Sequence, residues 1–173
     1  MVETAEYDVI RKDGSFEIRR YHEMLMAEVD QTRGSGFNTL FQYISGKNKA
    51  KPKIAMTSPV MTSEKIAMTS PVMSTASKMG FMVPSEYTME TVPEPSNPRV
   101  TIVKIPERFV ATVRFKGFAW KNEVKKQTKL LLDWLHKENI ETKGSVFLMQ
   151  YNPPFVPGFL RRNEMGIEII YNE

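Results

Sequence analysis

The sequence predicts an α+β fold in which two copies of a βαβ-type unit build a distorted β-barrel or curved antiparallel sheet flanked by two helices. Three observations favour this class. The order of expected strands and helices in the first half of the chain recurs in the second half. A proline-rich stretch, residues 87–99, separates the two copies and has the composition of a linker. A nine-residue segment, KIAMTSPVM, occurs twice within the first copy.

The first copy is expected over residues 7–86 and starts with two strands. Phe16–Tyr21 alternates in the manner of a strand with one mixed face, and Met24–Val29 follows after a short link. The apolar spacing of GFNTLFQYI then predicts a helix, with Ser35 as its N-cap and a glycine after its end. Met79–Val83 is the last strand of this copy, because a proline ends it.

The doubled segment occupies Lys53–Met61 and Lys65–Met73. Each copy alternates as a strand does, and Thr62–Glu64 between them is a plausible turn, so the pattern predicts a hairpin of two like strands. Its methionines are expected mainly to fill the core. We therefore expect this hairpin to be structural and the binding site to lie elsewhere.

The second copy is expected over residues 99–171 and repeats the same order. Val100–Ile105 and Phe109–Phe115 are its first strands. A helix over Ala119–Asn139 is predicted by an apolar stripe with lysines largely opposite it. Val146–Tyr151 and Met165–Tyr171 complete the copy as strands on either side of a loop rich in proline and aromatic residues.

Composition indicates one soluble domain. The chain has 173 residues, with 41% hydrophobic and 25% charged residues, and no run approaches the roughly 18 apolar residues of a membrane span. The absence of cysteine excludes disulfides, thiolate metal sites and cysteine nucleophiles. We therefore expect a cytoplasmic protein without a membrane span, present as a monomer or a weak oligomer.

The sequence gives little support to nucleic-acid binding or to catalysis. The net charge is only +4, and the densest basic run, residues 121–129, lies within a helical pattern that indicates a solvated face. No nucleic-acid motif accompanies it, so no nucleic-acid partner is expected. Ser58 and Ser70 have no histidine near them in sequence, and no other catalytic motif is present, so the protein is not expected to be an enzyme.

Five short motifs together resemble the SOUL/haem-binding protein family, and the doubling of the first is similar to the compact prokaryotic branch of that family. The resemblance runs from about Tyr7 to Tyr171 and implies a single SOUL-like domain over residues 1–173, with a barrel built from two repeated halves. The motifs are IAMTSPV, FEIRRY at 16–21, FMVPS at 81–85, YNPP at 151–154 and RRNE at 161–164.

The resemblance implies non-covalent binding of haem or a related tetrapyrrole, for storage, transport or sensing. The implied cleft lies between the first helix and the YNPP loop. Carried over by position, the residues that contact the ring are Phe37, Leu40, Phe41, Tyr151 and Phe155. Gln42 and Val156 stand where relatives can have lysine, so Arg33, together with Arg161 or Arg162, remains as a cation for the propionates.

The resemblance also raises the question of an axial iron ligand. Some family members are thought to ligate iron through a histidine in the first strand, where this chain has Arg20. His22 follows two residues later on the same strand face, so it is the candidate metal ligand, with a polar role at the strand end as the alternative.

Several alternatives remain at this level. The arginines of Arg161–Glu164 can hold a ligand's carboxylates, or can pair with Glu164 to fix the last strand. The protein can instead be a sensor of hydrophobic small molecules, similar to the effector-binding domains of the same duplicated architecture. It can also be a protein-interaction module that uses its methionine-rich hairpin.

Overall fold

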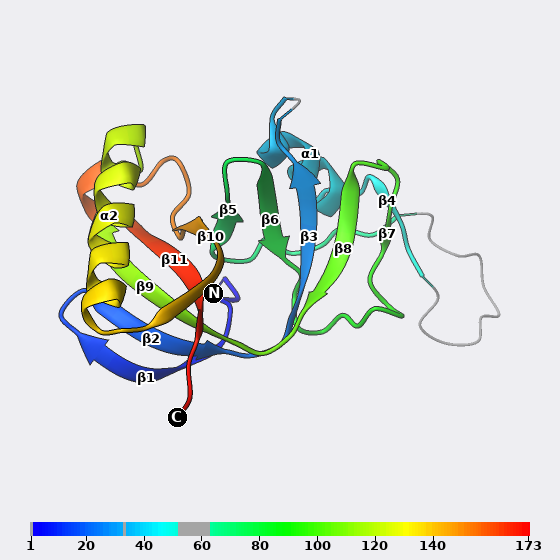
Figure 1. Ribbon diagram of the computed structural model, residues 1–173. Coiled ribbons are helices and arrows are strands. Elements are labelled where there is room, and N and C mark those ends of the chain that lie inside the picture. The colour runs from blue at the N-terminus through cyan, green and yellow to red at the C-terminus, as the bar shows by residue number, and fades with distance from the viewer. Residues whose placement is uncertain (1, 33, 52–62) are drawn as a thin grey trace.

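The computed structural model describes residues 2–32, 34–51 and 63–173 (Figure 1). An antiparallel sheet of nine strands curls into a half-barrel, and two helices pack on its outer side. The helices are α1 (Gly36–Ile44) and α2 (Lys121–Lys137), with a 3-10 turn at Gly158–Leu160. The strands of the sheet are β1 (Tyr7–Asp13), β2 (Phe16–Tyr21), β3 (Met24–Asp30), β5 (Val72–Ser74), β6 (Lys78–Met82), β8 (Val100–Ile105), β9 (Arg108–Lys116), β10 (Glu141–Gln150) and β11 (Arg162–Ile170). A separate short pair consists of β4 (Asn48–Lys49) and β7 (Glu94–Pro95).

The predicted α+β class and its curved antiparallel sheet with two helices are confirmed. Ser35 caps α1 as expected, since its side chain accepts a hydrogen bond from the backbone N–H of Asn38. Two features differ from the expectation: β1 was not predicted, and β10 starts at Glu141, five residues before the expected strand. Both stretches are largely exposed, so they lack the buried alternation that identifies a strand in sequence.

The order of strands in the sheet explains how the two copies fit together. It runs β1-β2-β9-β11-β10-β5-β6-β3-β8. With β1 left out, the strands counted inward from one end are β2, β9, β11 and β10, and from the other end β8, β3, β6 and β5. Each strand therefore lies opposite its equivalent in the other copy, which defines a pseudo-twofold relation. The first strand of each copy pairs with the second strand of the other copy, β2 with β9 and β8 with β3. The halves also meet where Met149 of β10 lies opposite Met73 of β5.

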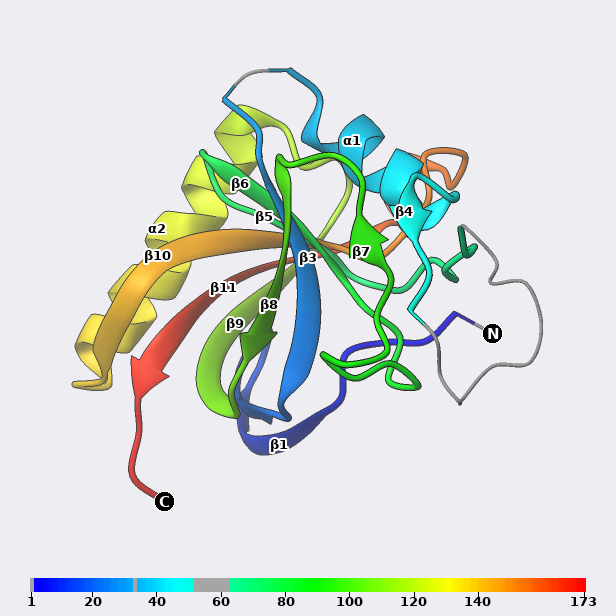
Figure 2. The same ribbon diagram turned by 90° about the vertical axis from the view of Figure 1, so that its right-hand side faces the viewer.

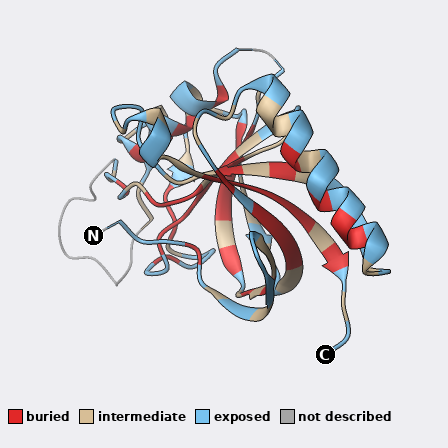
Figure 3. Ribbon diagram, turned by 90° about the vertical axis from the view of Figure 1, so that its left-hand side faces the viewer, coloured by how far each residue is buried: buried red, intermediate tan, exposed pale blue. Residues whose placement is uncertain are grey.

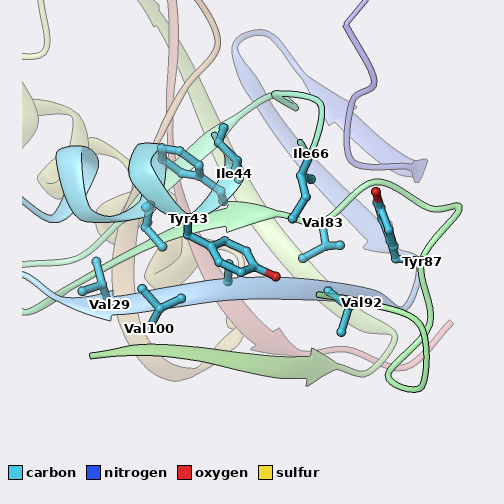
Figure 4. Close-up of a cluster of buried hydrophobic side chains, with 11 residues drawn as sticks. Val29, Tyr43, Ile44, Ile66, Val83, Tyr87, Val92 and Val100 are labelled. Atoms are coloured by element: carbon cyan, nitrogen blue, oxygen red, sulfur yellow. The ribbon is translucent and has the colours of Figure 1, made fainter. Parts of the chain in front are cut away.

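The strand exchange produces three groups of buried side chains. One lies under α1 and includes Tyr43 and Ile44 against Val29 and Val100 (Figure 4). A second lies under α2 around Leu131. The third, inside the curl, draws on both copies and is rich in methionine, which confirms a packing role for the methionines it contains. Buried residues accordingly concentrate in the centre of the sheet, while the outer faces of the helices are exposed (Figure 3).

Residues 87–99 are packed against the first copy instead of running free as a linker. Tyr87 and Val92 belong to the cluster under α1 (Figure 4). The hydroxyl of Tyr43 donates a hydrogen bond to the carbonyl oxygen of Pro93 at 2.7 Å, and Glu94–Pro95 pairs with β4. The composition predicted a linker from the prolines alone. The apolar residues Tyr87 and Val92 anchor the segment to the first copy.

The prediction for the doubled segment is wrong for its second copy. Lys65–Met73 is not a continuous strand, because only Val72 and Met73 belong to β5. Pro71 has no N–H for a sheet, and the hydroxyl of Thr69 donates to the carbonyl of Met82. The first copy, Lys53–Met61, lies outside the described residues, so the hairpin itself stays a prediction.

Among the described residues, no helix combines the length and the apolar character that crossing a membrane requires.

Candidate functional site

The helix α1 presents two aromatic rings on its outer side. Phe37 and Phe41 are 42% and 48% exposed, and their rings stack with centroids 6.1 Å apart. Phe37 also contacts the ring of Phe81 edge-on at 5.3 Å. Leu40 is 0% exposed and packs in the core beneath the helix. The structure therefore places Phe37 and Phe41 where a ligand can reach them, and Leu40 where it supports the helix from inside.

The candidate site has two walls. The helix α1 is the first, and the loop between β10 and β11 is the second. Arg161 shapes this loop, since its guanidinium donates hydrogen bonds to the carbonyl oxygens of Val156, at 2.8 Å, and Pro154. The side chain of Asn152 accepts a further hydrogen bond from the backbone N–H of Arg162 at 2.6 Å. Phe155 projects from the loop with 85% of its surface exposed. The proline-rich loop is thus held in place by its own hydrogen bonds while presenting an aromatic ring.

The second copy of the doubled segment connects the two walls. At one end the backbone N–H of Ile66 donates to the carbonyl oxygen of Ile44, the last residue of α1, at 2.7 Å. At the other end the hydroxyl of Ser70 donates to the carbonyl oxygen of Tyr151 at 3.3 Å. Both walls lie at the same end of the molecule (Figures 1 and 2). The second copy of the doubled segment thus runs from the end of α1 to the start of the loop.

Tyr151 belongs to a buried polar network behind the loop. Its hydroxyl donates to the carboxylate of Glu164 at 2.8 Å. That carboxylate also accepts hydrogen bonds from Arg19, at 2.6 and 2.8 Å, and from Arg162 at 2.8 Å. For the RRNE motif, the contacts therefore agree with the structural alternative, in which arginine pairs with Glu164 and fixes the last strand.

Burial and charge set the protonation states of this network. Burial by itself would raise the pKa of Glu164, but the hydrogen bonds and positive charges of Arg19 and Arg162 outweigh it and hold that pKa below its usual range. Burial, together with neighbouring Tyr21 and Glu164, raises the pKa of Tyr151 far above its ordinary value. Glu164 is therefore a carboxylate at neutral pH, and Tyr151 remains a hydrogen-bond donor.

The cations expected for the propionates are placed differently. Arg33 lies outside the described residues. The guanidinium of Arg161, besides its bonds to the loop carbonyls, lies 4.8 Å from the ring centroid of Phe118. In this structure Arg161 therefore shapes the loop.

His22 lies in the connection between β2 and β3. That connection is at the end of β3 opposite α1 (Figure 1). Its ring nitrogens lie 2.9 Å from a carboxylate oxygen of Asp8 and 3.4 Å from one of Glu6. The hydrogen bond with Asp8 raises the pKa of His22 above its ordinary value. The histidine faces a cavity of about 450 Å³ that is also lined by Glu3 and Glu90. The structure does not bring His22 together with the rings of α1 and the loop.

Within the described part of the chain, no group of three or more histidine, cysteine, aspartate or glutamate side chains is arranged to hold a metal ion.

The fold and the motifs define a duplicated barrel-type binding domain, and comparison with known proteins gives its family. The chain belongs to the SOUL family, since the model described as SOUL heme-binding protein matches residues 2–168. It is 30% identical over 162 residues to Heme-binding protein 2 of Mus musculus, covering 87% of this chain and 77% of that protein. It is 29% identical over 171 residues to Heme-binding protein 2 of Homo sapiens, covering 94% and 82%. The resemblance seen in the motifs is confirmed.

Solved structures share the fold at low sequence identity. A structure described as a hydrolase from Listeria innocua superposes with a TM-score of 0.58 at 12% identity, covering 93% of this chain and 94% of that one. The EcmrR C-terminal domain superposes with a TM-score of 0.54 at 10% identity, covering 95% and 98%. At such identities these likenesses concern the fold alone.

Proposed function

We propose that this protein binds haem or a related tetrapyrrole non-covalently between α1 and the loop 151–161, above the segment 65–70. The observation that carries the proposal is the pair of stacked, exposed rings of Phe37 and Phe41, joined to the loop of Phe155 by a segment bonded to both walls. Exposed apolar rings gathered at one end of a domain mark a ligand site. The family, and the names of its relatives from mouse and man, favour haem as the ligand.

The residues present fit a planar apolar ring with acidic substituents. Phe37, Phe41 and Phe155 offer faces or edges for stacking. Lys65 is exposed next to the buried Ile66 and supplies a cation for a carboxylate at the edge of the ring. The chemistry of the site is thus that of holding a flat hydrophobic ligand with its charged side toward water.

Axial ligation by histidine does not belong to this site. The chain has two histidines. His22 lies in the connection between β2 and β3, and His136 lies in the last turn of α2, away from the walls of the site (Figure 1). We infer that affinity comes from ring contacts and charge, which allows the ligand to be released. Reversible holding of this kind suits storage, transport or sensing of a tetrapyrrole.

Titration with hemin, followed at the Soret band, tests the proposal. The wild type should show a saturable change at micromolar protein, and iron-free protoporphyrin should bind as well. Replacing both Phe37 and Phe41 by alanine should weaken binding at least about tenfold, since two ring contacts contribute roughly 1 kcal/mol each. Ile170→Ala removes an equally exposed side chain on β11 and should leave affinity unchanged. No saturable change in the wild type would exclude haem binding, and full affinity in the double variant would exclude this site.

A second candidate function is the sensing of lipophilic cations in the cavity beside His22. Four carboxylates, those of Glu3, Glu6, Glu23 and Glu90, line it and outnumber its two basic side chains, His22 and Lys104. They share it with apolar residues that include Met24 and Met82. A hydrophobic cavity with negative charge at its rim suits a cationic ligand. Saturable binding of rhodamine 6G that hemin fails to displace would support this function, and absence of dye binding would exclude it.

A further inference from the structure

A second exposed apolar surface lies outside the cores and shares one residue, Phe155, with the proposed haem site. Among the described residues, the four large apolar side chains with the greatest exposure lie in two loops. They are Phe155 (85%), Phe159 (74%), Trp120 (70%) and Leu160 (61%). With Phe118, at 45%, they form what we call the aromatic patch. Isolated exposed apolar residues are ordinary, but a group of five in two adjoining loops marks an interaction surface.

The two loops of the aromatic patch are joined to each other. The side-chain amide of Asn163 donates to the carbonyl oxygen of Gly117 at 2.7 Å. Gly158 fits directly against the ring of Phe118, since a Cβ there would lie 2.5 Å from it. The guanidinium of Arg161 lies 4.8 Å from the centroid of the same ring. Phe118 in turn stacks on Trp120, with ring centroids 5.6 Å apart. The patch is therefore a preformed surface.

The patch is not part of the folded interior. None of its five members belongs to the three clusters of buried side chains. The loops that carry it lie at the end of the molecule where α2 begins (Figures 1 and 2). Rings exposed in this way do not stabilise the domain by burial. Their exposure therefore indicates a surface that binds another molecule or a membrane.

Positive charge lies beside the aromatic patch. Lys116, Lys121 and Lys125 are exposed beside its first loop, and none of them forms an ion pair within the described part of the chain. The one carboxylate in this stretch, Glu123, accepts a hydrogen bond from Gln127. Aromatic side chains are the residues preferred at the interface of a bilayer, and each nearby lysine adds about 1 kcal/mol on an anionic surface.

We propose that the aromatic patch docks this protein on the surface of membranes that contain anionic phospholipid. Its rings would enter the headgroup region while the lysines meet the lipid phosphates and carboxylates. A protein partner is the less favoured occupant, because the rings stand on exposed loops, and the lysines beside the first of them are unpaired within the described residues. Docking goes beyond the proposed haem site and does not need it, although Phe155 belongs to both surfaces.

Binding to vesicles tests the proposal with the haem-free protein. Trp120 is exposed and Trp134 is buried, so contact with lipid should shift Trp120 fluorescence to shorter wavelength. We expect sedimentation with phosphatidylcholine vesicles that contain phosphatidylserine, and at least tenfold weaker binding without phosphatidylserine. The double variant Phe155→Ser, Phe159→Ser should lose at least tenfold in vesicle binding while its unfolding curve is unchanged, since both rings are exposed. Val9→Ser, which changes an exposed apolar residue outside the patch, is the matched control and should bind vesicles as the wild type does.

Vesicle binding and haem binding can be tested independently, because different variants should affect each. Replacing Phe37 and Phe41 by alanine should leave vesicle binding unchanged, whatever it does to haem binding. Reversal of Lys121 and Lys125 to glutamate should abolish the preference for phosphatidylserine. No sedimentation of the wild type with phosphatidylserine vesicles would overturn the proposal. So would self-association through the patch, detected by sedimentation velocity, in a protein that does not bind vesicles.

Discussion

Arg19 and Glu164 form a doubly hydrogen-bonded ion pair inside the half-barrel, with nitrogen–oxygen distances of 2.6 and 2.8 Å. Their strands are not neighbours, because β9 lies between β2 and β11 in the sheet. The two residues come from different copies of the repeat and are 145 positions apart in the chain. The pair therefore fastens the exchanged strand β2 of the first copy to the last strand of the second copy.

Neutralising Glu164 should destabilise the protein strongly. Both side chains are buried, and Glu164→Gln would leave Arg162 without its carboxylate and Arg19 with the carboxylate of Glu17 alone. We expect a loss of about 3–5 kcal/mol in the free energy of unfolding, measured with urea. Glu138→Gln is the matched control, because Glu138 pairs with Arg11 at the same 2.6 Å but in contact with water. That pair should contribute less than about 1 kcal/mol, and equal losses in the two variants would contradict the burial argument.

The same pair should make stability depend on acid pH. The ordinary pKa of a glutamate is 4.5, and the pKa of folded Glu164 lies below it. The unfolded chain therefore binds a proton first as pH falls. The contribution of the pair is fully present above pH 4.5 and is lost as pH falls through the lower, folded pKa. Urea unfolding at a series of pH values should show this loss in the wild type, and a flatter profile in Glu164→Gln.

Two glycines in equivalent strands should respond differently to alanine. Gly166 of β11 lies opposite Phe147, whose ring atoms would be 2.9 and 3.0 Å from an added Cβ. Gly80 of β6 would meet the terminal methyl of Met26 at 2.7 Å, and that flexible group can turn away. Gly166→Ala should therefore cost about 1–3 kcal/mol of unfolding free energy, and Gly80→Ala distinctly less. The reverse order, in urea titrations of both variants, would show that Met26 cannot move.

Removing the hydroxyl of Tyr43 should loosen residues 87–99. The Tyr43→Phe variant leaves the buried carbonyl oxygen of Pro93 without its donor, which should cost about 1–3 kcal/mol. Limited proteolysis should then cut within 87–99 faster than in the wild type. Tyr171→Phe provides the control, since its hydroxyl makes no hydrogen bond with the described part of the chain. Unchanged cleavage in Tyr43→Phe would mean that the buried apolar residues and the pairing with β4 anchor the segment without this hydrogen bond.

His22 should titrate above its ordinary pKa of 6.5, because Asp8 stabilises its protonated form. A folded pKa raised in this way contributes stability below pH 6.5 that disappears as pH rises through the folded value. Proton NMR of His22, recorded in a His136→Asn background to leave one histidine, measures this pKa directly. Asp8→Asn should bring it down toward 6.5. A His22 signal that titrates at 6.5 in the wild type would show that the contact with Asp8 does not hold in solution.

The sequence by itself determined the local elements and the family. The spacing in GFNTLFQYI located α1, and Ser35 located its start, because helix periodicity and capping depend on neighbouring residues. The motifs identified the SOUL family, and the recurring order of elements indicated the duplication. The resemblance, carried over by position, named Phe37, Phe41 and Phe155, which the structure leaves exposed, and Leu40, which it buries.

Only the tertiary structure decided what depends on distant pairing. The exchange of β2 and β8 between the copies, and the ion pair of Arg19 with Glu164, join residues that no periodicity relates. The course of Lys65–Ser70 between α1 and Tyr151 follows from hydrogen bonds made at its two ends, and its own alternation suggested a strand instead. The position of His22 was likewise set by the turn between β2 and β3, which carries it away from the rings of α1. Local pattern predicts a helix because its hydrogen bonds join residues four apart, whereas strand pairing and a site depend on contacts between elements far apart in the chain.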